Sequence, residues 1–322
     1  MKIEDLHYSL LNVPVDEENF DLGKWRRENP MDYLKALYLV LSSGDWVPGI
    51  QNHIAMAVSF KAIYKLTRLY IPDTLYKFYS LTDDCVLDKK KFTTLENRKI
   101  FMSNIKDFND PFDGKAFFYN PEELKGIKRL ESHNGWLIDD FTVFHRGTAL
   151  TENDTNCMPM WAHYSNNHQG FCVAYDMKES GNLALSSCAF PIQYTDQRFD
   201  ITSFMKKYAN MVESEIDKQT LLGSKKIVIK DLSLVYVAQY LCNIKHLSWK
   251  YEKEFRCTMG AVSKGMPFVD AIPKAVYIGM NCSKKNRQRL IKIAKKLSVP
   301  IYQMKFDELS DEYALVADLL ET

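Results

Sequence analysis

Apolar residues recur with a helical period in the first part of the chain. Pro30 precedes the largely apolar run 31–40, and a proline in the first turn is typical of a helix start. A second run, 51–69, carries a broad apolar stripe at helical spacing, and Pro72 ends it. The pattern therefore predicts a helical N-terminal extension over residues 1–72.

After this segment the pattern changes to short, aromatic runs that are typical of β-strands. Such runs predict strands over residues 75–79 and 99–103 with a helical stretch between them. Further strands are expected at 141–150, 170–176, 254–259, 274–280 and 300–306, and helices at 121–132, 158–165, 201–218, 227–243 and 283–297. This succession predicts an α+β domain over residues 73–322, with a mixed sheet and flanking helices.

Composition and charge narrow the class of protein. The 322 residues are 46% hydrophobic and 13% aromatic, which is ample for a packed core. The 42 basic and 41 acidic residues give a net charge of +1. This balance excludes a protein that holds nucleic acid by overall charge alone, so a nucleic-acid site would have to be a local patch.

Cysteine usage and apolar runs predict a cytoplasmic protein. The seven cysteines are scattered without a CxxC pair or finger-like spacing, as expected of reduced thiols. Residues 1–15 carry acids and no long apolar run, unlike a signal peptide. No run reaches the roughly 18 apolar residues that cross a bilayer, so no membrane partner is expected.

The common dinucleotide, phosphate-loop, hydrolase and zinc-protease motifs are absent. Residues 107–114 carry aspartates and a glycine, as calcium loops do. However, Pro111 and Phe118 occupy positions where such a loop needs ligands, and no metal is expected here.

Three segments concentrate polar and aromatic side chains, and the first is the turn 108–114. It places Asn109 and Asp110 between two phenylalanines and before a proline, which favours a defined turn. A structural turn is one interpretation. The other is that the turn edges a pocket, with Asp110 or Asp113 facing a ligand.

The second segment, 161–171, precedes a predicted strand. It contains Trp161, His163, Tyr164 and His168 together with two asparagines. The two histidines are too far apart for the usual metal pair on one helix face. A solvated helix end is one interpretation. A binding loop is the other, because aromatic rings offer stacking faces and amides offer directed hydrogen bonds.

The third segment, 249–256, opens a predicted strand. Period-2 alternation would place Glu252, Glu254 and Arg256 on one face. A surface strand with paired charges is one interpretation. Alternatively, a glutamate in a cleft could bind a ribose hydroxyl and stabilise an oxocarbenium ion.

The predicted last helix is strongly basic. A solvated amphipathic helix explains it, and a patch facing phosphate or RNA is the alternative. Its cations are Lys284, Lys285, Arg287, Arg289, Lys292, Lys295 and Lys296.

Four blocks of the chain resemble a widespread bacterial domain-of-unknown-function family, which carries FNDPFD, WxHYxxxHxGF and YEKE(F/W)R in this order. The resemblance covers residues 75–306 and leaves 1–70 outside. The blocks are LYKFYS at 75–80, FMSN leading into FNDPFDG at 101–114, WAHYSNNHQGFCVAYD at 161–176 and WKYEKEFR at 249–256.

The layout of that family is similar to that of ADP-ribosyltransferase-like toxins. The resemblance implies that Lys77 contacts NAD and that Ser103 helps to shape the nicotinamide pocket. Those transferases usually have His or Arg at the first of these positions, so Lys77 departs from their pattern.

The same resemblance implies the remaining roles. Tyr164 or Trp161 would stack on a ring, and Glu254, with Glu252 as its rival, would be catalytic. Further contacts with NAD are expected from Tyr79, Asn109, Asp110, His163, His168 and Arg256.

The first interpretation is thus an NAD-dependent ADP-ribosyltransferase-like toxin or phage-defence enzyme that modifies protein or nucleic acid. NAD would be its substrate, and an antitoxin or regulatory partner would dock on the N-terminal helices. One alternative is a non-catalytic nucleotide- or RNA-binding module that uses Trp161, Tyr164 and the basic helix. The other is a metal-assisted nuclease built on Asp110, Asp113, His163 and Glu254.

Overall fold

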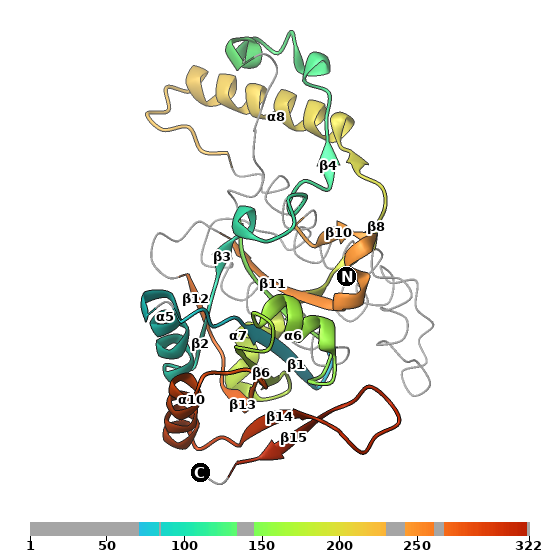
Figure 1. Cartoon of the computed structure of the whole chain (residues 1–322). Coiled ribbons are helices and arrows are strands. Elements are labelled where there is room, and N and C mark those ends of the chain that lie inside the picture. Colours follow the sequence, from blue (N-terminus) through green and yellow to red (C-terminus); the bar gives the residue numbers. More distant parts are fainter. Residues whose placement is uncertain (1–70, 84, 134–144, 230–241, 261–266, 321–322) are drawn as a thin grey trace, which may run out of the picture.

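A computed structural model describes residues 71–83, 85–133, 145–229, 242–260 and 267–320. The helices predicted at 31–40 and 51–69 lie outside these ranges, and so does most of the helix predicted at 227–243. Within the described ranges the chain forms an α+β structure around a mixed sheet (Figure 1). The predicted fold class is therefore confirmed.

The central sheet combines antiparallel pairs with one parallel pair, β13 with β14, among the described strands. Helix α10 (Lys284–Leu297) connects these two strands, so the last strand–helix–strand unit lies in one sheet. The strands lie in the order β15 (Leu315–Leu319), β14 (Ile301–Phe306), β13 (Pro273–Ile278), β6 (Phe171–Asp176), β1 (Thr74–Tyr79), β5 (His145–Thr151), β11 (Glu254–Gly260) and β7 (Ala189–Pro191), and β3 (Ser103–Asn104) pairs with β5.

Helices cover both faces of the sheet. The α-helices are α5 (Cys85–Glu96), α6 (Met158–Tyr164), α7 (Leu183–Ser187), α8 (Thr202–Leu221) and α10 (Lys284–Leu297). The connections also contain short 3₁₀-helices: η1 (Ile105–Asp107), η2 (Pro121–Leu124), η3 (Lys128–His133), η5 (Ser180–Asn182) and η6 (Leu247–Glu252). Three small pairs complete the fold: β2 (Lys99–Phe101) with β12 (Phe268–Asp270), β4 (Phe117–Phe118) with β9 (Phe199–Asp200), and β8 (Gln193–Thr195) with β10 (Ile244–His246).

Two element predictions need correction. The predicted helix 121–132 is two 3₁₀-helices, η2 and η3, because Gly126 between them has a positive φ of 91° that an α-helix does not allow. The predicted strand 99–103 divides into β2 and β3, which join different sheets. Met102 lies between them and donates its N–H to Pro267, outside either ladder.

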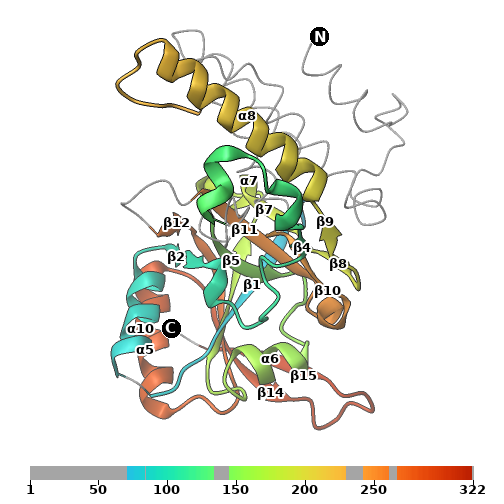
Figure 2. The ribbon, with the colours of Figure 1, turned by 90° about the horizontal axis from the view of Figure 1, so that it is seen from above.

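The side chains of β1 alternate between two hydrophobic clusters. Leu75 lies in the main core, where α5 contributes Phe92 and α10 contributes Leu290. Phe78, on the other face, packs with Trp161 of α6. Figures 1 and 2 both show α5 and α10 side by side, away from α6. A third cluster joins α8 to η2 and β4.

A seam between β1 and β5 is the feature that positions the site. β1 pairs with β6 along its whole length, from Thr74 to Tyr79. It pairs with β5 at a single register position, Tyr76 opposite Thr151. The sheet therefore opens beside this pair. Backbone N–H and C=O groups that a continuous ladder would pair can instead form hydrogen bonds with side chains.

Candidate functional site

A small cavity of about 80 Å³ lies at this seam. It brings together five of the residues proposed from the sequence: Lys77, Asn109, Tyr164, Glu252 and Glu254. The full lining is Tyr76, Lys77, Phe78, Phe108, Asn109, Ala149, Leu150, Thr151, Met160, Tyr164, Lys245, Glu252 and Glu254.

Lys245 joins the two glutamates. Its Nζ lies 2.7 Å from Glu252 Oε2 and 3.1 Å from Glu254 Oε2, and all three side chains are almost completely buried. The sequence did not point to Lys245, which follows buried Ile244 in β10. A buried pair of carboxylates needs a counter-charge, and this requirement is the signal that could have found it.

Arg256 holds Glu254 from the protein interior. Its Nε lies 2.8 Å from Glu254 Oε1, and a terminal nitrogen lies 2.9 Å from Asp113 Oδ1. The other terminal nitrogen donates to the backbone oxygen of Cys242 at 2.6 Å, and the guanidinium stacks 4.7 Å from the ring centre of Phe108. Arg256 is 0% exposed, so it orients Glu254 rather than touching a ligand.

The two glutamates differ in their electrostatic setting. Burial favours a higher pKa for Glu254, but Arg256 and Lys245 outweigh burial and hold that pKa below its ordinary value. Burial raises the pKa of Glu252, and Lys245 offsets this only in part. Burial opposes the charge of Lys245, yet Glu254 and Glu252 together raise its pKa. Glu254 is therefore the carboxylate that stays ionised most firmly.

Tyr164 is tied to Glu252 and to the predicted turn. Its hydroxyl donates to Glu252 Oε1 and accepts a hydrogen bond of 3.0 Å from Asn109 Nδ2. Burial, followed by the hydrogen bond to Glu252, raises the pKa of Tyr164 well above its usual range. Tyr164 therefore remains a phenol that can donate a proton in a hydrogen bond.

Lys77 borders the cavity and uses the opening of the seam. Its ammonium donates to the backbone oxygen of Ala149, on β5, at 3.1 Å. Burial lowers the pKa of Lys77 to about 8, although Glu254 and Cys257 favour its charged form. The protonated form of Lys77 therefore destabilises the folded protein.

This cost predicts a pH dependence. Between pH 8 and the ordinary lysine pKa of 10.5, the unfolded chain binds more protons than the folded protein. The contribution of Lys77 to the free energy of unfolding should therefore rise with pH across this window, by about 3 kcal/mol in total. Lys77→Met should lack the rise. Urea titrations from pH 7.5 to 10.5 on wild type, Lys77→Met and the exposed-site control Lys295→Met would measure it, and equal slopes in all three would contradict the prediction.

Other residues proposed as ligand contacts lie elsewhere. Tyr79 stacks on Phe171, and its hydroxyl lies 3.3 Å from that of Tyr175 in the main core. Ser103 pairs with Gly147 in the sheet and does not line the cavity. Asp110 forms the turn itself, because its Oδ1 accepts the N–H of Phe112 at 2.9 Å.

The second polar segment divides between core and surface. Trp161 is 0% exposed, donates its Nε1–H to Thr155 at 2.8 Å and packs edge-on against Phe78. Of the two rings proposed to stack on a ligand, Tyr164 is the one at the cavity. His168 stacks on Trp161 with ring centres 5.8 Å apart, whereas His163 is exposed.

The polar run after α6 forms a tight turn. Asn166, Asn167 and His168 have positive φ values of 52°, 53° and 65°, a conformation that asparagine tolerates better than most residues. Asn166 Nδ2 donates to Leu81 at 2.8 Å, and Asn281 Nδ2 donates to Asn167 at 2.9 Å. The side-chain amide of Asn166 and the backbone oxygen of Asn167 thus both serve the turn, which accounts for Asn166 without a ligand.

Gly170 ends this turn against the last residue of β1, and its substitution should be strongly destabilising. A Cβ at this position would lie 1.8 Å from the backbone oxygen of Tyr79, which cannot move without breaking the β1–β6 ladder. Gly170→Ala should lower the free energy of unfolding by about 3 kcal/mol. Gly126→Ala, where φ is +91° but no atom lies within 4 Å, should cost about 1 kcal/mol. Urea denaturation of both variants compares them, and a loss in Gly170→Ala no larger than that in Gly126→Ala would show that the close contact with Tyr79 is relieved at little cost.

The residues proposed for a nuclease do not converge. Asp113 is paired with Arg256, His163 lies on the surface, and Asp110 closes a turn. Across the described residues, no group of three or more His, Cys, Asp or Glu side chains is placed to hold a metal ion.

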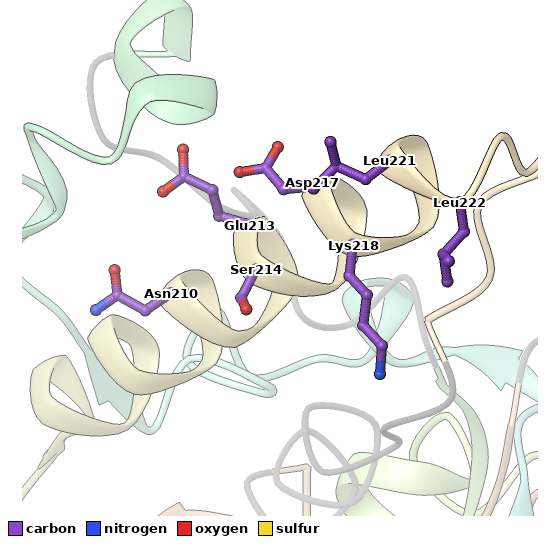
Figure 3. A pocket seen from close by; sticks show the side chains of 7 residues that line it. All are labelled: Asn210, Glu213, Ser214, Asp217, Lys218, Leu221 and Leu222. Atoms are coloured by element: carbon purple, nitrogen blue, oxygen red, sulfur yellow. The ribbon is translucent and has the colours of Figure 1, made fainter.

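A wider, open hollow of about 660 Å³ runs along α8. Figure 3 shows its side chains projecting from this one helix, with Glu213 and Asp217 on one side and Lys218 and Leu222 on the other. The described lining therefore comes from a single element and brings no distant polar groups together. The cavity at the seam is the better candidate for a site.

The fold and the cavity define an α+β protein with a buried acidic and basic cluster at a strand seam. Residues 160–257 match a family described as a protein of unknown function, DUF2971. The match supports a domain-of-unknown-function family for this part of the chain. It includes Tyr164, Lys245, Glu252 and Glu254, whereas Lys77 lies outside it.

The other comparisons give no relative. No curated protein and no solved structure matches the chain. In the part of the chain that the structure describes, every helix is too short or too polar to cross a bilayer. The biochemical function must therefore be argued from the cavity itself.

Proposed function

We propose that the protein cleaves the bond between nicotinamide and ribose in NAD and transfers ADP-ribose to a protein or nucleic-acid acceptor. The observation that carries this proposal is Glu254, an ionised carboxylate at a cavity, braced by Lys245 and Arg256. Two cations fix its position and its charge before any substrate arrives. A site prepared in this way stabilises a developing positive charge without having to reorganise.

The cavity suits one ring of such a substrate. Its volume of about 80 Å³ is well below the roughly 300–1,000 Å³ of a pocket that encloses a whole ligand. The ribose at the reacting end would enter, and the rest of the dinucleotide would extend outside.

The chemistry then divides among three side chains. When the bond from ribose C1′ to nicotinamide nitrogen breaks, its electron pair leaves with nicotinamide, and C1′ becomes an oxocarbenium-like centre that Glu254 stabilises. Glu252, which has the higher pKa, accepts the proton of the acceptor nucleophile as the new bond to C1′ forms. The Tyr164 phenol, already bonded to Glu252, orients that carboxylate.

The test is incubation of the purified protein with labelled NAD and cell extract, with nicotinamide release and label transfer followed together. Release with transfer supports the proposal and identifies the acceptor class. Release without transfer would reduce the activity to NAD hydrolysis, and no release would reject the proposal.

A nucleotide- or RNA-binding module without catalysis is the second candidate, and α10 favours it. This helix contains seven basic residues and no acidic residue, while Leu290, Ile293 and Leu297 are buried against the core. Binding of an oligonucleotide that weakens steeply with salt, without nicotinamide release, would support this candidate.

A further inference from the structure

Three aromatic residues form an exposed shelf beside the cavity. The aromatic shelf consists of His163, at the end of α6, and Trp249 and Tyr251, on η6. The ring centres of Trp249 and Tyr251 are 6.3 Å apart, and those of His163 and Tyr251 are also 6.3 Å apart. His163 is exposed, Tyr251 is 39% exposed and Trp249 is half-buried. These rings contact one another at the surface rather than in the core.

The shelf and the cavity belong to the same two elements. His163 directly precedes Tyr164, and Tyr251 directly precedes Glu252. The hydrogen bond from Tyr164 to Glu252 connects α6 with η6, so it fixes the shelf relative to the cavity. A ligand that occupies the cavity would therefore pass close to the aromatic shelf.

Lys245 connects the cavity to the aromatic shelf through a cation–π contact. Its ammonium, which pairs with both cavity glutamates, also lies 4.7 Å from the ring centre of Trp249. A cation held against the face of an indole ring fixes that ring, so Trp249 is held in place by the same lysine that holds the cavity glutamates.

The surroundings of the shelf favour one class of ligand. Lys250 lies between Trp249 and Tyr251 in the chain, Lys253 follows Glu252, and both lysines are exposed. Flat rings interleaved with cations suit the base and the phosphate of a nucleotide. A lipid or an apolar peptide would instead need a continuous apolar patch, and His246 and Ser248, which are exposed and polar, interrupt this one.

We propose that the aromatic shelf is a nucleobase-binding subsite, with Lys250 and Lys253 supplying positive charge for the phosphate. The inference rests on the proposed function, because it identifies what lies outside the ring-sized cavity. The base has two sources, the adenine of NAD or a base of a single-stranded nucleic-acid acceptor. The shared chemistry is stacking, and the two sources can be separated by experiment.

The test is calorimetric binding to the full chain of NAD, a single-stranded RNA octamer and ribose 5-phosphate, which has no base. Tyr251→Ala should weaken binding of a base-bearing probe by about 10-fold or more, as expected for the loss of one stacked ring. Tyr251→Phe, which keeps a ring, should bind like wild type. Tyr313→Ala, at a residue that is 95% exposed in the β14–β15 connection, is the matched control and should change nothing.

Each outcome decides the inference. A loss confined to NAD assigns the subsite to the donor, and a loss confined to RNA assigns it to the acceptor. The inference is overturned if wild type binds neither base-bearing probe, if Tyr251→Ala binds both like wild type, or if ribose 5-phosphate loses as much affinity as they do. If wild type releases nicotinamide and Tyr251→Ala binds both NAD and the RNA octamer like wild type, the shelf alone is rejected. Ring-dependent binding without release would instead reject the transferase alone.

Discussion

Glu254→Gln should lower the rate of nicotinamide release from NAD by about 1,000-fold, the scale seen when one fixed electrostatic contact to a transition state is lost. The substitution keeps the shape of the side chain and removes its charge. Since the charge matters most when the ribose becomes cationic, the loss should fall mainly on kcat. Initial rates over a range of NAD concentrations measure it.

Glu252→Gln separates the roles of the two carboxylates. If Glu252 accepts the proton of the nucleophile, this variant should lose transfer to the acceptor more than it loses nicotinamide release. Glu312→Gln, at an exposed position, is the neutral control. A Glu254→Gln protein that keeps wild-type turnover would contradict the assignment, and a larger loss of release in Glu252→Gln would exchange the two roles.

The pairing of Glu254 with Arg256 was predictable because it depends on strand alternation, whereas the placement of Glu252 on the same strand face was wrong. Period-2 alternation places Glu254 and Arg256 on one face of β11. Glu252 lies in η6, outside the strand, but Lys253 between them has a left-handed conformation with φ of 44°. That single residue turns the chain so that Glu252 meets its neighbours at Lys245.

Non-local contacts were not predictable from the pattern. Lys245 is conspicuous only once both glutamates are known to be buried. The strand order was equally unpredictable. In the sheet β1 lies between β6 and β5, although both of these strands come much later in the sequence. The seam at Tyr76 and Thr151, and hence the cavity, follows from that pairing and from no property of either strand alone.

The segment 161–171 shows why polarity is a poor guide to a ligand site. Its asparagines favour a binding loop and a tight turn equally, because an amide can bond to the backbone as well as to a ligand. The structure uses Asn166 in the turn and buries Trp161 beneath it. Tyr164 is the member of the segment that reaches the cavity, and its partner Glu252 lies 88 residues away in the chain.

Arg256→Ala should lower the free energy of unfolding by about 4 kcal/mol, because removing one partner of a buried ion pair leaves the other charges unpaired. Here Asp113 and Glu254 would both lose their guanidinium contact inside the protein. Arg256→Lys should recover only part of the loss, since an ammonium cannot bond to Glu254, Asp113 and Cys242 in the same forked geometry.

The destabilisation of Arg256→Ala should also depend on pH. Burial raises the pKa of Asp113 to about 6 even beside Arg256, which opposes the shift, so removing the guanidinium should raise it further. At pH 5 Asp113 is protonated in both proteins, whereas at pH 8 the variant must either keep that proton or bury the charge without a partner. The difference in unfolding free energy from wild type should therefore be smaller at pH 5. Urea titrations at both values measure it, with Asp113→Asn in the same background removing the contribution of Asp113. If Arg256→Ala unfolds like wild type at both pH values, the guanidinium does not hold these carboxylates, and the fixed charge of Glu254 must have another origin.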